Sequence, residues 1–303
     1  MAIEVQNLAS SAKPATDLKD PIHLRLRDLV YQASGIYHPE EKLYLLVGAC
    51  NRRIAAAKIR TAREYMDLLA TPQGRAAELR ELLNEITIGE TSLFRSRPQL
   101  DALRNVILPE LCAVRGKTGV KKLRLWSAGC STGEEAYTLA MVLLEERERL
   151  LQGWAFEITA TDLNDRSLET ARAGVYGSYA LRNTPEYFRQ KYFCADSENR
   201  LRVNDGVKQC VSFSRLNLSD DSKMVFMKGM DLIFCCNVLI YFDLQSKKRV
   251  IQHFYANLLT NGYFFLGNSE TLYQVSESFR VIHLPGTIAY WKASPESAEI
   301  KKT

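Results

Sequence analysis

Two glycines and a later carboxylate are the first residues of this sequence whose spacing indicates ligand chemistry. A strand-like run at residues 123–128 leads into a turn with Gly129 and Gly133, after which a helix is predicted. Glycine lets the backbone approach a ligand closely, and the helix N-terminus offers free N–H groups. Asp162 ends the next predicted strand, where a carboxylate can accept hydrogen bonds from both ribose hydroxyls. The pattern predicts a nucleotide-type cofactor, although a tight turn without a ligand would carry the same glycines.

Two acidic residues at the start of the predicted helix, Glu134 and Glu135, bear on the choice of cofactor. NAD or a nucleotide sugar would place phosphates at this helix N-terminus, where the carboxylates would repel them. S-adenosylmethionine has no phosphate and carries an ammonium and a sulfonium group. The acids therefore favour S-adenosylmethionine, unless they only complement the helix dipole.

An apolar run at residues 231–236 is typical of a buried strand, and Asn237 follows it. Ligands bind at the carboxyl ends of strands in open α/β sheets, so Asn237 and nearby Tyr241 are candidate site residues. A buried strand followed by a core tyrosine would have the same pattern. Methyltransferases of exocyclic base amines often have two prolines here, whereas this chain has Val238 and Leu239, which argues against a nucleic-acid substrate.

An arginine in a weakly periodic stretch before the α/β pattern is a further candidate. Thr91, Ser92 and Phe94 closely precede Arg95. An arginine flanked by hydroxyls and aromatics can bind a carboxylate through two hydrogen bonds. A linker with a solvated arginine fits the spacing equally well.

Four arginines form a possible docking surface. At 100° per residue, Arg52, Arg53, Arg60 and Arg63 fall within about one quadrant of a helix. Residues 51–62 contain no acid that would neutralise them. They predict a surface for an acidic helix or for RNA, while the simpler interpretation is a solvated face.

The composition is that of an ordinary globular chain, with 46% hydrophobic and 25% charged residues. A formal net charge of +5 fits an acidic partner but does not by itself indicate nucleic-acid binding. No apolar run approaches the roughly 18 residues of a membrane span, and the N-terminus lacks the apolar core of a signal peptide. We therefore expect no membrane insertion.

The seven cysteines include no CxxC pair, and several lie in apolar runs, which is typical of reduced thiols. We expect no disulfide framework and a cytoplasmic location. The four histidines are widely spaced, so we expect no metal site.

Hydrophobic periodicity divides the chain into a helical part and an α/β part. Strands alternate with helices in the second part, which predicts a mostly parallel sheet with a final antiparallel hairpin. The turn signal Asp205-Gly206 predicts a small β insertion at about 188–210. In chain order we expect a flexible lead at 1–20, a helical domain at 21–84, a linker at 85–98, an α/β domain at 99–293 and a flexible tail at 294–303.

Taken together, these motifs resemble the CheR family of chemotaxis receptor methyltransferases over residues 22–291. The resemblance rests on the order and spacing of ETSLFR (90–95), WSAGCSTGEE (126–135), ATDL (160–163), ARAGVY (171–176), NL (217–218), NVLIYF (237–242) and GNSE (267–270). It implies a helical N-terminal domain that contacts the receptor. It also implies a Rossmann-like S-adenosylmethionine methyltransferase domain with a small β subdomain.

The resemblance implies roles for individual residues. Thr91 and Arg95 would reach the cofactor, Glu134 would be the acid of the turn, and Asp162 would hold the ribose. Asn217 and Leu218 would lie near the adenine. The full set of implied cofactor contacts is Gly89, Thr91, Arg95, Ala128, Gly129, Glu134, Asp162, Asn217, Leu218, Cys236 and Asn237.

Three positions depart from the pattern of the family. Gly89 stands where many members have Asn, so a side-chain contact is lost or replaced by the backbone. Cys236 stands where many have Arg, and Asn268 where His is common. These departures affect individual contacts rather than the choice of cofactor.

The activity that the resemblance implies is O-methylation of glutamate side chains in the acidic helical cytoplasmic region of a chemoreceptor. S-adenosylhomocysteine would be the second product. A glutamate at pH 7 is already an anion and needs no general base. Arg95 would hold a carboxylate and Tyr241 would orient the incoming glutamate. The β insertion is a candidate site for a receptor-tail peptide.

The sequence leaves two other functions open. One is methylation of RNA or of a small molecule on the same fold. The other is a non-catalytic module that binds the cofactor or its product and signals through the helical domain.

Overall fold

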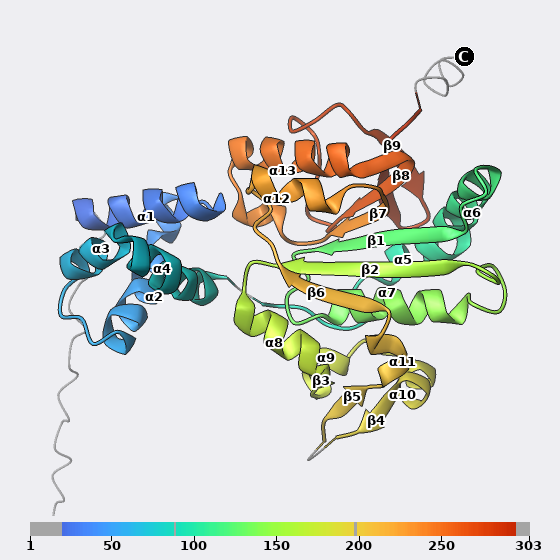
Figure 1. Cartoon of the computed structure of the whole chain (residues 1–303), viewed down its shortest axis with the longest axis horizontal. Coiled ribbons are helices and arrows are strands. Elements are labelled where there is room, and N and C mark those ends of the chain that lie inside the picture. The colour runs from blue at the N-terminus through green and yellow to red at the C-terminus, as the bar shows by residue number, and fades with distance from the viewer. Residues whose placement is uncertain (1–19, 88, 197–198, 295–303) are drawn as a thin grey trace, which may run out of the picture.

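The computed structural model describes residues 20–87, 89–196 and 199–294 (Figure 1). The expected lead at 1–20 and tail at 294–303 lie outside the described residues, apart from Asp20 and Ser294. A helical domain occupies one end of the molecule, and an α/β domain with a small second sheet occupies the other.

The N-terminal domain is a bundle of helices whose ends are set by local capping residues. Asp20 caps the first helix by accepting a hydrogen bond from the Ile22 N–H, and Gly35 ends it at φ 75°. Leu26, Leu46 and Leu82 are buried in the core of the bundle. The helices are α1 (Pro21–Ser34), the 3₁₀ turn η1 (Glu40–Lys42), α2 (Leu43–Ala56), α3 (Ala62–Ala70) and α4 (Pro72–Ile86).

The expectation of one helix carrying all four arginines is wrong. The chain leaves α2 at Ala56, and Lys58 adopts the left-handed φ of 57°. Thr61 then caps α3 by accepting from the Glu64 N–H. A left-handed residue cannot continue an α-helix, so Arg52 and Arg63 lie on different helices.

The main sheet has seven strands in the order β6-β2-β1-β7-β8-β10-β9. The first five are parallel, and β10 pairs antiparallel with both β8 and β9, so the predicted mostly parallel sheet and final hairpin are confirmed. The strands are β1 (Lys122–Ala128), β2 (Ala155–Asp162), β6 (Val211–Arg215), β7 (Met230–Cys235), β8 (Leu258–Leu266), β9 (Arg280–Leu284) and β10 (Thr287–Trp291).

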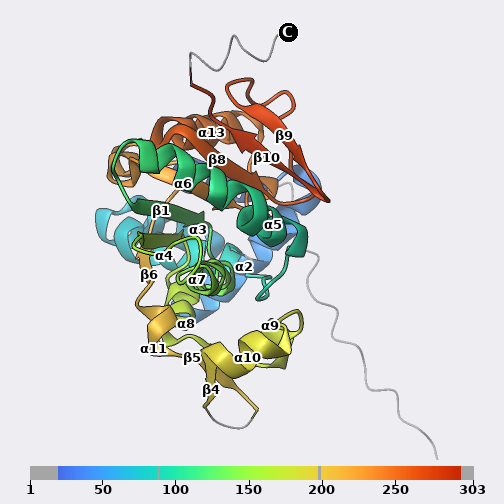
Figure 2. The ribbon, with the colours of Figure 1, turned by 90° about the vertical axis from the view of Figure 1, so that its right-hand side faces the viewer.

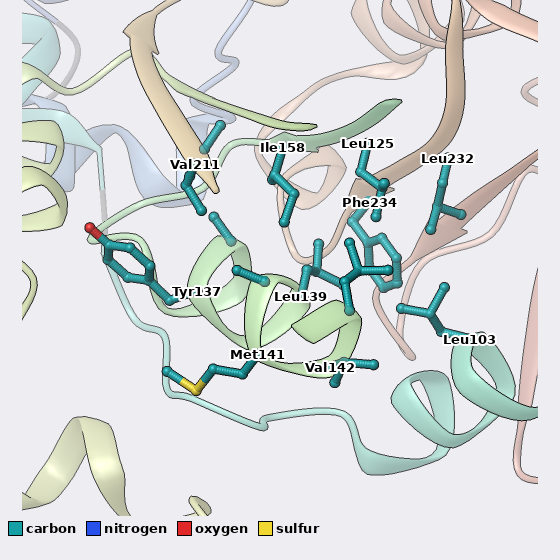
Figure 3. Packing of buried hydrophobic residues seen from close by; sticks show 14 of the residues in the cluster. Leu103, Leu125, Tyr137, Leu139, Met141, Val142, Ile158, Val211, Leu232 and Phe234 are labelled. Atoms are coloured by element: carbon teal, nitrogen blue, oxygen red, sulfur yellow. The ribbon is translucent and has the colours of Figure 1, made fainter. Parts of the chain in front are cut away.

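Side chains alternate between two cores, one on each face of this sheet. Leu125 and Phe234 pack toward Leu139 of α7 (Glu134–Glu145), as Figure 3 shows. Trp126 points to the opposite face and packs with Phe254 of α13 (Leu244–Asn257). The helix α8 (Asp165–Ala173) follows β2, and the short helix α12 (Asp221–Met224) with the 3₁₀ turn η3 (Val225–Met227) precedes β7.

A helical segment before β1 covers one edge of the first core. This segment is not one regular helix, because it consists of α5 (Arg97–Ala102), a π-helical turn η2 (Leu103–Ile107) and α6 (Leu108–Lys117). Pro109 cannot donate the backbone hydrogen bond of a regular helix, and the π turn ends two residues before it.

The small β insertion is a separate sheet built from three segments of the chain. Its sheet contains β3 (Val175–Tyr176), β5 (Leu201–Val203) and β4 (Phe193–Ala195) in that order. The insertion therefore begins before residue 188. Figure 2 shows β4 and β5 below the main sheet. Asp205 opens a short helix, α11 (Asp205–Lys208), capped by Asn204, because an Asn cap favours a helical turn over a hairpin turn. The helices α9 (Ser178–Leu181) and α10 (Glu186–Tyr192) complete this subdomain.

The carboxyl ends of the central strands face the helical domain (Figure 1). The Ile36–Phe242 bridge and the hydrogen bond from Asn217 Nδ2 to the Ala33 carbonyl (2.7 Å) tie the end of α1 to this edge. On α4, Asn84 Oδ1 accepts from the Asp165 N–H at 2.9 Å. These contacts enclose a cleft between the two domains.

Candidate active site

The cleft is a cavity of about 900 Å³ at the carboxyl edge of the sheet. Three parts of the chain line it: the helical domain, the segment between α4 and α5, and the loops that follow the strands. Ser34 and His38 contribute from the first part, Thr91 and Arg95 from the second, and Gly129 from the third. Such a position at the end of parallel strands is where open α/β sheets bind ligands.

The turn after β1 forms the floor of the cavity. Gly129 has a φ of 77°, and a Cβ there would lie 2.4 Å from the side chain of Val238, so only glycine fits. Ser131 holds a left-handed φ of 51°, which is uncommon for a residue with a side chain. Backbone strain of this kind is retained at ligand sites when surrounding contacts fix it.

Asp162 stands beside that turn. Its carboxylate accepts hydrogen bonds from the Ser131 N–H at 2.7 Å and from the Asn164 N–H at 2.8 Å. Desolvation in the cleft raises the pKa of Asp162 above its usual value, while these N–H donors lower it. Each oxygen retains a lone pair for a further donor, as two ribose hydroxyls would supply.

Glu135 is a site residue that the sequence interpretation did not single out from its neighbour. It lines the cavity and accepts a hydrogen bond from Ser127 Oγ at 2.6 Å. Desolvation raises the pKa of Glu135 to about 7, and hydrogen bonds from Ser127 and Cys236 oppose that rise. A carboxylate held this far from water is suited to a cationic ligand.

Glu134 and Ala128 are not among the residues that line the cavity. The Glu134 side chain is buried and accepts a hydrogen bond from Thr132 Oγ1 at 2.6 Å. Consecutive residues of a helix point about 100° apart, so only one of the two acids can face the ligand. In this structure the geometry favours Glu135 rather than the expected Glu134.

The segment between α4 and α5 is fixed against the subdomain. Glu90 accepts hydrogen bonds from the Tyr179 hydroxyl (2.7 Å) and from Arg182 (3.1 Å). Arg95 donates to the Glu90 carbonyl at 2.9 Å. Gly89, Thr91 and Arg95 all line the cavity, as the sequence interpretation expected of cofactor contacts.

The loop after β7 is shaped by a buried acid. Glu270 accepts hydrogen bonds from the backbone N–H groups of Asn237 (2.6 Å), Ile240 (3.2 Å) and Gly267 (2.8 Å). Asn237 has a left-handed φ of 62° and lines the cavity with Tyr241. Burial raises the pKa of the Tyr241 phenol, so the hydroxyl stays protonated and able to donate.

Cys236, Asn217 and Leu218 also line the cavity. Cys236 Sγ lies 3.6 Å from Gln99 Oε1, and Gln99 donates to the Leu266 carbonyl at 2.6 Å. Gln99 is a further cavity residue that the sequence interpretation missed, because a single amide side chain gives no chemical signal in the sequence. The Asn217 amide already donates to Ala33, which leaves its oxygen to accept from the Ser219 N–H.

Three buried polar atoms without partners belong to residues that line this cleft. Among the described residues, His38 Nδ1, Ser96 Oγ and Ser131 Oγ are buried and have no hydrogen-bond partner, and all three residues line the cavity. Native proteins rarely leave such atoms unsatisfied, so the cavity has the character of a ligand site.

The four arginines do not form one free surface. Arg53 makes two hydrogen bonds to the Glu78 carboxylate at 2.8 and 3.0 Å, and its side chain is only 14% exposed. Arg52 pairs with Glu85 at 2.5 Å, and Arg60 pairs with Glu64 at 3.4 Å. These glutamates lie on α3 and α4, outside residues 51–62, which contain no acid. Arg60 and Arg63 remain exposed.

The described residues contain no group of three or more His, Cys, Asp or Glu side chains arranged for a metal ion. All seven cysteines are free thiols. No helix in the described part of the chain has the length and apolar character that a membrane crossing requires.

Comparison with protein families decides the identity. The profile described as "CheR methyltransferase, SAM binding domain" matches residues 89–288, and "CheR methyltransferase, all-alpha domain" matches residues 24–87. The chain belongs to the CheR methyltransferase family. Individual relatives agree with this assignment.

A chemotaxis protein methyltransferase 2 of Vibrio cholerae is 32% identical to this CheR-family chain over 91% of the chain and 94% of the relative. A chemotaxis protein methyltransferase of Borreliella burgdorferi is 35% identical over 82% of the chain and 87% of the relative. The chain is therefore an S-adenosylmethionine-dependent methyltransferase with an all-helical N-terminal domain.

The residues present in this CheR-family cleft fit S-adenosylmethionine. Glu135 and Asp162 supply negative charge and hydrogen-bond acceptors, and Ser131 supplies an unpartnered hydroxyl. The ammonium and sulfonium groups of the cofactor are cations, and its ribose hydroxyls are donors. The acidic turn would repel a pyrophosphate.

Proposed function

We propose that this enzyme methylates glutamate side chains in the acidic helical cytoplasmic region of a chemotaxis receptor, forming glutamyl methyl esters. The observation that carries the proposal is the composition of the cleft. Glu135 and Asp162 line it, and so do Arg95 and Tyr241. Acids on the floor suit a cationic cofactor, and a guanidinium with a phenol suits an anionic substrate. The protein would act in the cytoplasm, where such receptor regions lie.

S-adenosylmethionine, when bound, supplies an electrophilic methyl group on a sulfonium. The substrate glutamate is an anion at pH 7, so the chain need not provide a general base. Its residues have two tasks instead, which are to align the carboxylate and to exclude water. Alignment alone can contribute several kcal/mol to lowering the barrier.

Asp162 would hold the ribose, with Asn217 and Leu218 near the adenine and Asn237 at the end of β7. The other proposed cofactor contacts that line the same cavity are Gly89, Thr91, Gly129 and Cys236. Arg95 would bind one carboxylate, and the protonated Tyr241 hydroxyl would donate a hydrogen bond to the incoming glutamate. These roles are supported by the position of each residue on the cavity wall.

The receptor would approach across the helical domain. Arg60 and Arg63 are exposed there, and Lys42 at the cleft rim has no ion-pair partner among the described residues. Exposed cations near the cleft would attract an acidic helix and raise the rate of encounter. Arg52 and Arg53 are engaged with Glu85 and Glu78, so their contribution would be indirect.

The small sheet offers a second contact for a receptor. The outer edges of β3 and β4 have no strand partner among the described residues. An extended peptide, such as a receptor tail, could add to such an edge through backbone hydrogen bonds. Tethering at this subdomain would raise the local concentration of the receptor near the cleft.

The test is methyl transfer from radiolabelled S-adenosylmethionine to a purified cytoplasmic fragment of a chemotaxis receptor. We expect label in the protein that mild base releases as methanol, which is the behaviour of an ester, and no label when the receptor glutamates are replaced by alanine. Label that resists base, or that enters RNA in place of protein, would contradict the proposal.

A further inference from the structure

His38 is a cavity residue for which neither the sequence motifs nor the comparisons give a role. It lies between α1 and η1, and only 9% of the residue is exposed. It lines the cleft, and its Nδ1 has no hydrogen-bond partner among the described residues. A buried ring nitrogen without a hydrogen-bond partner lowers the stability of the folded protein. A ligand that forms a hydrogen bond with His38 would remove this cost.

The backbone places His38 beside the reacting end of the proposed site. Ile36 forms an antiparallel bridge with Phe242, and the Tyr37 N–H donates to the Tyr241 carbonyl at 2.9 Å. His38 is the next residue along the chain. His38 therefore follows directly the backbone contact with Tyr241, and both residues line the cleft.

The imidazole is uncharged in the free protein. Burial lowers the pKa of His38 below its usual value, so near pH 7 one ring nitrogen carries a proton and the other does not. With the proton on either nitrogen, the ring can donate one hydrogen bond without carrying a charge. The acids of the cleft floor, Glu135 and Asp162, accept from other donors.

We propose that His38 is a substrate-binding residue that donates a hydrogen bond from its imidazole to the carboxylate of the glutamate being methylated. This inference rests on the proposed function. One carboxylate oxygen must attack the methyl group, while the other is free to accept a hydrogen bond. A neutral donor orients the carboxylate and withdraws less electron density from the attacking oxygen than a full cation would.

The alternative ligand for His38 is the cofactor. The groups suited to the cofactor come from the loops after β1 and β2, whereas His38 comes from the helical domain, one residue after the hydrogen bond between Tyr37 and Tyr241. Lys42 lines the same helical wall and has no ion-pair partner among the described residues, so its charge favours an anion, whereas Arg52 on this wall is paired with Glu85. Measuring receptor methylation and cofactor binding separately shows which of the two His38 contacts.

The decisive variants are His38→Leu, which removes the ring nitrogens, and His38→Asn, which keeps a donor near the Nδ1 position. The control is His283→Leu, the same change at an exposed position on β9. Three quantities are measured for each: kcat/KM with a receptor cytoplasmic fragment, the Kd of S-adenosylhomocysteine by calorimetry, and the melting temperature of the ligand-free protein.

We expect His38→Leu to lower kcat/KM by roughly tenfold or more, the loss typical of a hydrogen bond to a charged group. Its Kd for S-adenosylhomocysteine should stay within about twofold, and its melting temperature should be equal or higher because an unsatisfied buried nitrogen is gone. His38→Asn should recover most of the activity, and His283→Leu should match the wild type.

Three results would overturn the assignment of His38. Weaker S-adenosylhomocysteine binding by His38→Leu would place the residue in the cofactor site. A lower melting temperature with parallel loss of every activity would make it a structural histidine. Unchanged kcat/KM beside an active wild type would show that it does not touch the substrate. No methyl transfer by the wild type would instead overturn the proposed function, and the inference with it.

Discussion

Among individual residues, Glu135 most directly links the electrostatics of the cleft to its ligand. Its carboxylate has one strong partner, Ser127, and its pKa of about 7 places its titration in the physiological range. Because the folded pKa lies above the ordinary value of 4.5, the neutral form stabilises the ligand-free protein at low pH. That stabilisation is lost as the pH rises through about 7. A cationic cofactor has the opposite preference, for the ionised form.

Cofactor affinity should therefore depend on pH through Glu135. We expect the Kd for S-adenosylmethionine to rise as the pH falls below about 7, by up to tenfold per pH unit. Glu135→Gln should bind more weakly at pH 8 and show a flatter profile between pH 5.5 and 8. Calorimetric titrations across that range provide the measurement, and an unchanged slope in the variant would assign the dependence to another group.

Asp162 supports a second prediction at this scale. Asp162→Ala removes the acceptor beside the first turn and should weaken S-adenosylhomocysteine binding by roughly tenfold to a hundredfold. Asp67→Ala, an exposed acid on α3, is the matched control and should bind normally. Equal affinity of both variants in calorimetry would remove the ribose assignment.

At the scale of elements, the cleft is built from loops held in strained conformations. Phe94, Ser131 and Asn237 are all at positive φ and belong to three different segments. Each segment is fixed by a neighbour: the Phe94 N–H donates to Thr138 Oγ1, the Ser131 N–H to Asp162, and the Asn237 N–H to Glu270. The strain is maintained because these contacts satisfy the backbone.

A substitution at Gly267 tests whether the contact between Asn237 and Glu270 holds the loop after β7 in place. A Cβ at Gly267 would lie 2.8 Å from both the Asn237 nitrogen and a Glu270 oxygen. Gly267→Ala should displace the loop after β7 and lower the free energy of unfolding by roughly 1–3 kcal/mol, with weaker cofactor binding. Gly177→Ala, which has nothing within 4 Å of the added atom, is the control. Chemical denaturation distinguishes them, and equal stability would mean that the loop adapts without cost.

For the whole molecule, ion pairs between helices of the N-terminal domain determine which of its charges face a partner. Arg53 is committed to Glu78 inside the helical domain, whereas Arg60 and Arg63 are exposed. Substituting the exposed arginines should therefore affect receptor binding. Substituting the ion pair inside the helical bundle should affect the stability of the fold.

Reversing the exposed charges should impair the receptor reaction selectively. Arg60→Glu with Arg63→Glu should raise the KM for a receptor fragment by roughly threefold to tenfold at low ionic strength, and the effect should shrink with added salt. S-adenosylhomocysteine affinity should not change. A KM that is insensitive to both the substitutions and salt would exclude this surface as the dock.

Arg53 should behave differently. Arg53→Ala leaves Glu78 without its bidentate partner and should lower the free energy of unfolding by roughly 3 kcal/mol. Urea denaturation measures this loss. A variant with normal stability but weaker receptor binding would reverse the interpretation and assign Arg53 to the interface.

The sequence alone determined the features that depend on local physics. Strand and helix periodicity indicated the α/β domain, and the final hairpin was predicted from two short apolar runs. Gly129 and Asp162 were identified as neighbours because the carboxyl ends of adjacent parallel strands meet at one edge. The membership of the CheR family followed from motif order along the chain and was confirmed.

Tertiary structure decided the features that depend on which distant groups meet. Glu134 and Glu135 are equivalent in sequence, and only packing against Ser127 and Thr132 shows which acid faces the cavity. The arginines looked unneutralised because their acids lie on other helices, as with Arg53 and Glu78. A missing hydrogen-bond partner, as at His38, is likewise a property of three-dimensional surroundings that no local pattern encodes.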